Sequence, residues 1–158
     1  MGAQSLSSCL LAVVLLAGCA DLGSRIVRVA DGDTVTALRD GGEIKIRLAE
    51  IDAPEKVQAY GAASTNALTE LCLNKLATLE ERGKDRYGRT LARVNCEGID
   101  ANAEQVRRGM AWVYRKYAPK DSPLYAAEDA AKAAKRGLWA DAEPVPPWEW
   151  RHRGKSEN

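Results

Sequence analysis

The chain has 158 residues, 46% of them hydrophobic, which suits one domain with a core of its own. Its 23 Lys and Arg residues are balanced by 22 Asp and Glu residues, and this net charge of +1 excludes recognition of a polyanion through global charge. The single histidine, His152, and four cysteines without CxxC spacing argue against a zinc site and against histidine-based catalysis. Any functional site must therefore come from a local group of residues.

The first residues are typical of an export signal. Residues 9–17 (CLLAVVLLA) are apolar, too short to span a bilayer as a mature helix, and lead into the sequence LAGC, which ends at Cys19. This pattern resembles the site at which bacterial lipoproteins are diacylated on the cysteine and cleaved before it. We expect residues 1–18 to be a lipoprotein signal peptide and residues 19–23 a lipidated linker. The alternative is an ordinary cleaved signal peptide in which Cys19 is incidental.

Export sets the expected location and the state of the other cysteines. Acyl chains on Cys19 would anchor the chain in a membrane. Since Asp21 does not directly follow Cys19, bacterial sorting rules favour the outer membrane, facing the periplasm or the cell surface. Cys72 and Cys96 form an even pair in an oxidising compartment, and we expect them to be bonded to each other. The alternative is two buried free thiols, because the sequence does not give the distance between their Cα atoms.

Three strands and a helix are expected in the first half of the chain. Residues 24–30 and 34–39 are strand-like and flank a DGD turn, and residues 43–48 return after the turn sequence DGG. After the proline that follows, apolar residues recur at helical spacing and predict a helix near residues 57–73.

The second half predicts two more strands and two more helices. The strands are expected at residues 76–81 and 90–96, and the helices at 101–110 and 124–136, the last of them closed by Gly137 as its C-cap.

Five strands with a helix after the third follow the element order of an OB-fold barrel. We therefore expect an α+β domain at residues 24–142, made of a five-stranded OB-fold β-barrel and three α-helices. Residues 143–158 form a tail whose prolines exclude a central strand or helix over residues 144–150. Trp148 and Trp150 of this tail are expected to lie on the body of the domain.

Charged residues gather where the third strand is expected to end. The sequence RLAEIDAPE, residues 47–55, puts one guanidinium and three carboxylates within nine residues. Asp52 lies where this strand opens into a loop and Asp33 follows another strand, so the two carboxylates can converge in a barrel and offer the hard oxygen ligands that Ca²⁺ accepts. Arg47 and Arg89 can grip a phosphate in a bidentate manner, and Glu55 can hold and deprotonate a water. Taken singly, each of these segments can also be an ordinary charged turn.

Four motifs in this order resemble the staphylococcal-nuclease (thermonuclease) family. They are DGDTV at residues 31–35, RLAEIDAPE at 47–55, DRYGR at 85–89, and GMAWVY followed by GLW at 137–139. The resemblance covers nearly the whole chain after residue 19. It implies the OB-fold barrel described above and a Ca²⁺-dependent nuclease.

The resemblance also implies a role for particular residues. Asp33, Asp52 and the backbone carbonyl of Ala53 match the calcium ligands, although the family often has Thr where this chain has Ala53. Asp31 matches an acid that supports metal-bound water. The catalytic residues would be Arg47 and Arg89, which contact the scissile phosphate, and Glu55, the proposed general base. The nucleotide would lie against Arg86, Tyr87, Tyr114 and Tyr117, and the last two could instead be ordinary core or surface aromatics.

The implied reaction is hydrolysis of phosphodiester bonds in DNA and RNA with low sequence specificity. Water would attack phosphorus in line and leave 3′-phosphate ends, and the protein would act as a monomer. The alternative is a non-catalytic OB-fold module that binds single-stranded nucleic acid or a protein partner. Such modules typically lose the acids or arginines, which this chain keeps. A weaker alternative is a surface-anchored structural lipoprotein.

Overall fold

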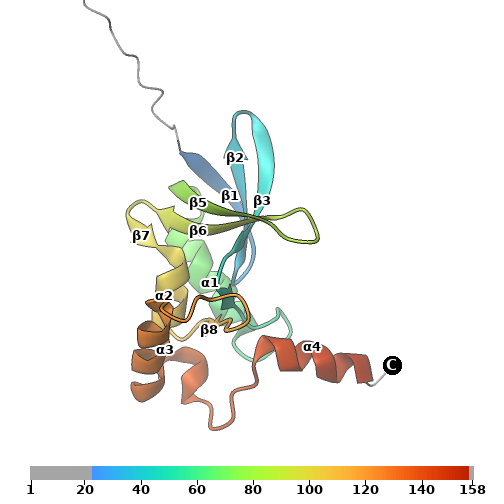
Figure 1. Cartoon of the computed structure of the whole chain (residues 1–158), viewed down its shortest axis with the longest axis vertical. Coiled ribbons are helices and arrows are strands. Elements are labelled where there is room, and N and C mark those ends of the chain that lie inside the picture. Colours follow the sequence, from blue (N-terminus) through green and yellow to red (C-terminus); the bar gives the residue numbers. More distant parts are fainter. Residues whose placement is uncertain (1–22, 157–158) are drawn as a thin grey trace, which may run out of the picture.

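The computed structural model describes residues 23–156 (Figure 1). The expected signal peptide and the lipidation site at Cys19 lie outside the described residues. Within the described part, no helix is both long enough and apolar enough to cross a bilayer.

A closed barrel of five strands forms the body of the domain. Its strands follow the sheet order β3-β2-β1-β5-β6, and a parallel pairing between β3 and β6, with Leu48 opposite Ala92, closes the barrel. The expected five-stranded barrel is confirmed. The strands are β1 (Ser24–Asp31), β2 (Thr34–Arg39), β3 (Gly42–Leu48), β5 (Leu76–Lys84) and β6 (Thr90–Cys96).

Three short strands complete the sheets. β7 (Ile99–Asp100) pairs with the end of β6, and β4 (Ile51–Asp52) pairs with β8 (Trp112–Val113) outside the barrel. The β4–β8 pair places Asp52 opposite Trp112, so the segment after the barrel's third strand is fixed to the helical part of the domain.

The barrel interior is filled by side chains that alternate along the strands. β6 is the clearest case, because every second residue from Thr90 to Cys96 is buried. Residues from the strands and from α1 meet there and leave almost no exposed apolar surface among them. The fully or almost fully buried members include Ile26, Val35, Ile46, Leu48, Leu68 and Val94.

The described residues form four α-helices beside the barrel, one more than expected. They are α1 (Gly61–Cys72), α2 (Ala101–Arg107), α3 (Leu124–Ala133) and α4 (Pro147–Ser156). Figure 1 shows α2 and α3 together on one side of the domain, with α4 running away from them toward the opposite side.

The fourth helix corrects the expectation that residues 144–150 are not helical. Proline was taken as a helix breaker, but Pro147 is the first residue of α4. At that position the missing N–H has no partner to lose and the fixed φ angle suits a helix. The proline therefore starts the helix.

The end of α3 also differs from the expectation. The helix ends at Ala133, and Gly137 begins a 3₁₀ helix, η1 (Gly137–Ala140), so the assignment of Gly137 as a C-cap is wrong. Gly137 has a φ angle of 53°, and a Cβ there would lie 2.3 Å from the carbonyl oxygen of Gly109. Glycine is needed here because two backbone segments touch, with the N–H of Leu138 donating to that same carbonyl at 2.9 Å.

A disulfide joins Cys72, the last residue of α1, to Cys96, the last residue of β6. Their Cα atoms are 5.3 Å apart, and both residues are fully buried. The bond fixes the end of the helix to the barrel and reduces the conformational freedom of the unfolded chain.

A buried acid ties α3 to β8. Glu128 is fully buried and accepts hydrogen bonds from the N–H of Val113 at 2.9 Å, from Arg115 at 2.6 Å and from Lys132 at 2.8 Å. Burial alone would raise the pKa of Glu128, but these hydrogen bonds outweigh it and hold the pKa below its ordinary value. The ionised carboxylate therefore fixes β8, whose partner strand carries Asp52.

Candidate active site

Two buried carboxylates meet at the Arg47 guanidinium. One Nη2 atom of Arg47 lies 2.9 Å from a carboxylate oxygen of Asp33 and 2.9 Å from one of Asp52. The other terminal nitrogen, Nη1, donates to the backbone carbonyls of Leu48 at 2.7 Å and Ile51 at 2.9 Å. The structure thus brings three of the predicted site residues into direct contact.

The sequence places Asp33 and Arg47 at the ends of barrel strands, and Asp52 ends the short strand β4 that follows β3. Asp33 lies in the turn between β1 and β2, and Arg47 is the next-to-last residue of β3, opposite Thr34. The turn is packed closely from behind, because a Cβ at Gly32 would lie 1.8 Å from the hydroxyl oxygen of Ser64 on α1. Glycine at this position lets the acidic turn sit against the helix.

Asp33 is the most perturbed of the acids. Burial is the main cause that raises the pKa of Asp33 to about 7, and the nearby carboxylates of Asp31 and Asp52 raise it further. The positive charge of Arg47 acts in the opposite direction and lowers the pKa. A hydrogen bond from the N–H of Ala53, 2.7 Å long, also lowers it. The carboxylate therefore sits in a place where further positive charge would be stabilising.

Asp31 supports the same turn. Its Oδ1 atom accepts the backbone N–H of Asp33 at 3.1 Å. Asp31 is thus held beside Asp33 by backbone geometry.

Arg89 lies next to this group and reaches it through Thr34. Its Nη1 is 3.5 Å from the Thr34 hydroxyl, which in turn donates to Asp33 at 3.1 Å. Asp85 orients the guanidinium by accepting from Arg89 Nε at 2.7 Å and from the Arg89 backbone N–H at 2.9 Å. Burial alone would raise the pKa of Asp85, but these bonds lower it below its ordinary value, so Asp85 stays ionised.

The DRYGR loop carries two of the four predicted nucleotide contacts, Arg86 and Tyr87. Tyr87 is exposed, and the guanidinium carbons of Arg86 and Arg89 lie 4.8 Å and 5.6 Å from the centre of its ring. Arg86 also donates to the Tyr87 hydroxyl at 2.6 Å. The loop therefore presents an aromatic face with two cations on it, Arg86 and Arg89.

Glu55 faces the C-terminal helix. Its Oε1 accepts from Arg151 Nη1 at 2.7 Å, and Arg151 Nη2 lies 2.7 Å from Asp52 Oδ2. Both carboxylate oxygens of Asp52 are therefore in contact with guanidinium groups, one oxygen with Arg47 and the other with Arg151.

The two predicted tyrosines form an edge-to-face pair whose ring centres are 4.9 Å apart. Tyr117 is largely exposed, whereas Tyr114 stacks in parallel on Trp148 of α4 with ring centres 5.4 Å apart. Trp112 meets Trp148 edge to face at 5.7 Å. Tyr114 is connected to the acidic group in two ways, through Trp148 of α4 and through its own backbone N–H, which donates to the Glu50 carbonyl at 2.8 Å just before β4.

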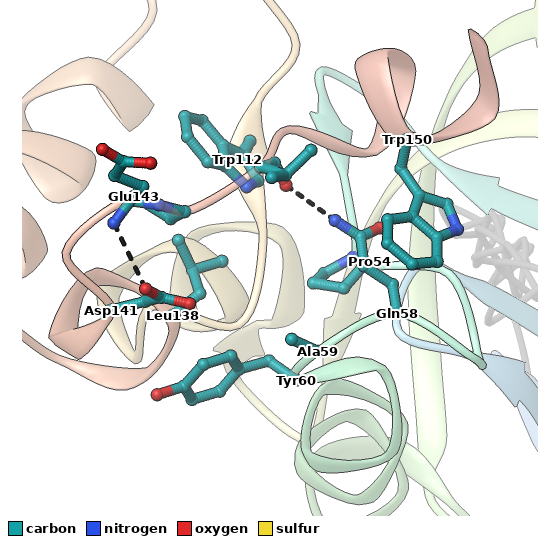
Figure 2. A pocket seen from close by; sticks show the side chains of 11 residues that line it. Pro54, Gln58, Ala59, Tyr60, Trp112, Leu138, Asp141, Glu143 and Trp150 are labelled. Atoms are coloured by element: carbon teal, nitrogen blue, oxygen red, sulfur yellow. Dashed lines mark hydrogen bonds between the residues drawn. The ribbon is translucent and has the colours of Figure 1, made fainter. Parts of the chain in front are cut away.

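The segment before α4 docks against the loop after β4. The Gln58 amide donates to the Val145 carbonyl at 2.6 Å. Figure 2 shows Trp150 beside Pro54. These residues line a small pocket, together with Trp112. The expectation that the tail tryptophans lie on the body of the domain agrees with these contacts.

The side chains of this site can supply part of the ligands of a hard divalent cation. Among the described residues, no three His, Cys, Asp or Glu side chains are arranged to hold a metal ion. Asp33 and Asp52 supply two carboxylates, and Ca²⁺ accepts backbone carbonyls and waters for the remainder. Two closely spaced buried acids that already attract Arg47 and Arg151 are a suitable place for such an ion.

The sequence analysis did not assign several residues of this site. Thr34 and Asp85 lie inside the DGDTV and DRYGR motifs. Asp85 begins a turn that is closed by a hydrogen bond from the Tyr87 N–H to its side chain, and an aspartate at the start of such a turn is a recognisable signal. Arg151 and Trp148 had only a weak signal, which was the aromatic and basic composition of the tail. Their contacts join residues far apart in the chain, so no local pattern could assign them a partner.

Comparisons with known proteins agree with the motifs. The family model described as staphylococcal nuclease homologue matches residues 45–141. An Escherichia coli O157:H7 protein named as an uncharacterized endonuclease is 47% identical over 136 residues, which cover 85% of this chain and 88% of that protein. A Haemophilus influenzae protein with the same name is 45% identical over 154 residues, covering 95% and 85% of the two chains. A Shigella flexneri protein named micrococcal nuclease is 35% identical over 163 residues, covering 97% and 94%. The chain therefore belongs to the staphylococcal nuclease homologue family.

Proposed function

We propose that the chain is a Ca²⁺-dependent nuclease that hydrolyses phosphodiester bonds in DNA and RNA with low sequence specificity. Its place in a nuclease family, with relatives named as nucleases at 35% to 47% identity, makes it an enzyme of the nuclease class. The observation that carries the finer proposal is the meeting of Asp33 and Asp52 at one Arg47 nitrogen. Arg89 is linked to Asp33 through Thr34, and Glu55 is linked to Asp52 through Arg151.

In this proposal the protein's own residues bind and orient the phosphate. Arg89 stays charged throughout and would donate to the nonbridging oxygens, which carry more negative charge in the transition state. The terminal nitrogens of Arg47 already bind Asp33, Asp52 and two carbonyls, so Arg47 would act by holding its positive charge beside the phosphate. Asp85 keeps the Arg89 guanidinium in a fixed orientation, so little has to reorganise during the reaction. Asp33, Asp52 and the Ala53 carbonyl would hold Ca²⁺, which supplies positive charge to the phosphate when bound.

Glu55 is the residue proposed to move the proton. It is half-exposed, so water can reach it, and it lies three residues after Asp52. An ionised carboxylate at this place can orient a water and accept its proton as the oxygen attacks phosphorus. The leaving 5′ oxygen would depart on the opposite side and give 3′-phosphate ends.

The test is digestion of plasmid DNA and of RNA by the purified chain, with Ca²⁺ and with a chelator. We expect cleavage only with Ca²⁺ and 3′-phosphate ends in the products. Binding of single strands without any cleavage would favour the alternative of a non-catalytic module, and cleavage undiminished in chelator would contradict the calcium requirement. Sedimentation of the same sample tests the proposed monomer.

A matched pair of arginine variants tests the proposed phosphate contact. Arg89 forms an ion pair with Asp85 and Arg93 forms one with Asp100, each at 2.7 Å. Of these two arginines, Arg89 is the one that lies beside the acidic group of Asp33 and Asp52. We expect Arg89→Ala to lower kcat by about 100- to 1,000-fold, the usual effect of removing one transition-state donor, and Arg93→Ala to leave it nearly unchanged. Equal activity of the two variants would remove Arg89 from the mechanism.

We also propose that the protein is exported and anchored through Cys19, in the outer membrane. The buried disulfide between Cys72 and Cys96 supports an oxidising compartment. Labelling cells with a radioactive fatty acid should mark the wild-type protein and leave Cys19→Ser unmarked. Equal labelling of the two would contradict the anchor.

A further inference from the structure

The C-terminal helix places a cation on the acids of the proposed site. Arg151 of α4 contacts Asp52 through both terminal nitrogens, at 2.7 Å and 3.3 Å, and contacts Glu55 at 2.7 Å. Asp52 is proposed to hold calcium and Glu55 to hold the attacking water. One guanidinium therefore engages two residues with separate tasks in catalysis.

The helix is held in this position at further points. The Trp148 ring lies parallel to Tyr114, the residue expected to face the nucleotide, and edge-on to Trp112. The amide of Gln58 binds the Val145 carbonyl just before the helix. The docked helix thus covers Tyr114 and contacts the acids, while Tyr117 stays largely exposed.

The Arg151 contacts are incompatible with a loaded site. Asp52 is almost fully buried, and its Oδ2 atom accepts Arg151 while its Oδ1 atom accepts Arg47. A divalent ion on Asp52 would lie beside a second like charge, which costs free energy in a partly buried place. The Glu55 Oε1 atom accepts a hydrogen bond from Arg151, so this oxygen is not available to accept a proton from the attacking water.

We propose that α4 is a self-inhibiting arm that closes the site while metal and nucleic acid are absent. Arg151 stands where calcium and the attacking water must act, and Trp148 covers Tyr114. Binding of Ca²⁺ displaces Arg151 and opens the arm. This inference rests on the proposed nuclease function, because it assigns the regulation of the same acids.

The arm is suited to release. α4 is the last helix of the described residues, and Figure 1 shows it running away from α2 and α3. The Arg151 and Glu55 side chains are each 40% exposed, so their ion pair is screened by water and is weak. A doubly charged ion can compete with such a contact.

The experiment compares Arg151→Gln with Arg153→Gln in the full chain. Arg153 lies on the same helix and forms a distant ion pair with Glu149, at 3.9 Å, so it controls for loss of charge. Calcium binding to chelator-treated protein is measured by calorimetry. We expect Arg151→Gln to bind Ca²⁺ about tenfold more tightly, because the closed state no longer reduces the binding-competent fraction, and Arg153→Gln to match the wild type.

A second measurement follows the arm directly. Chymotrypsin cleaves after aromatic residues, and Trp148 and Trp150 are present in both variants. In the wild type and in Arg153→Gln, Ca²⁺ should speed cleavage at these tryptophans. In Arg151→Gln, cleavage should be fast without Ca²⁺ and respond little to it.

Each outcome decides the matter. Unchanged calcium affinity in Arg151→Gln, with a chymotrypsin response like that of the wild type, overturns the arm while leaving the nuclease proposal standing if the wild type still cleaves DNA with Ca²⁺. Weaker calcium binding, or a raised KM for DNA, overturns it too, because Arg151 would then help to bind the ligand. If no variant binds Ca²⁺ or cleaves nucleic acid, the proposed function fails and the arm fails with it.

Discussion

Replacing Arg47 with alanine should destabilise the fold as well as stop the reaction. The side chain is 13% exposed, and its partners Asp33 and Asp52 are 8% and 3% exposed, so both ion pairs are buried. Removing one member of a buried pair typically costs about 3 to 5 kcal/mol, because the remaining charge has lost its partner. The Leu48 and Ile51 carbonyls also lose a donor, each worth about 1 kcal/mol.

The expected loss in the free energy of unfolding is therefore about 4 kcal/mol in chelator, since one acid can protonate and relieve part of the penalty. Urea unfolding followed by tryptophan fluorescence measures it. Calcium should restore part of the loss, because an ion that binds only the folded state stabilises that state and also neutralises the two acids.

Arg89→Ala is the matched control. Arg89 and Asp85 are more exposed than the Arg47 group, so their pair should contribute no more than about 1 kcal/mol. An Arg47→Ala protein that unfolds in chelator at the wild-type urea concentration would refute the reasoning, since the two acids would then need no internal cation.

Three further changes test the scaffold. Glu128→Gln should lower stability at pH 7 by about 2 to 3 kcal/mol. The pKa of Glu128 in the folded protein lies below the ordinary 4.5, so its contribution to stability is present above pH 4.5 and is lost as the pH falls below that value. The urea unfolding curves of the variant and the wild type should therefore converge at acidic pH. A difference that stays constant with pH would contradict this role of Glu128. Gly109→Ala should cost about 3 kcal/mol, because its Cβ would lie 2.1 Å from a backbone oxygen at a φ of 68°, whereas Gly41→Ala, with open space around it, should cost about 1 kcal/mol by thermal unfolding. Replacing Cys72 and Cys96 together by alanine should lower stability by about 3 kcal/mol, and a variant as stable as the oxidised wild type would show that the bond contributes nothing.

The barrel could be predicted because its signals are local. β2 and β6 begin and end at the residues expected from the alternation of side chains, and the burial of every second residue in β6 is the reason. The acidic group was within reach for a related reason. Asp33 follows β1 and Asp52 comes shortly after β3, at the end of the short strand β4, and the ends of neighbouring barrel strands lie close together.

The helix ends and α4 could not be predicted, because their causes are not local. Gly137 resembles a helix cap in the sequence, yet its role is to let one backbone pass close to Gly109. Pro147 resembles a breaker, yet it is the first residue of the helix, where the N–H has no partner within the helix. The partner of Arg151 lies 99 residues away, at Asp52, and only the folded chain brings the two together.

Burial separates the roles of the two arginines on Asp52. Arg47 is enclosed with both acids and with two carbonyls, so its loss leaves charges that water cannot reach. Arg151 approaches from the solvent side with 40% of its side chain exposed, so water can replace it at little cost. The same carboxylate can therefore keep one cation as part of the fold and exchange the other for a metal ion. This asymmetry is the reason why Arg47→Ala should unfold the protein more easily while Arg151→Gln should leave it stable and bind Ca²⁺ more tightly.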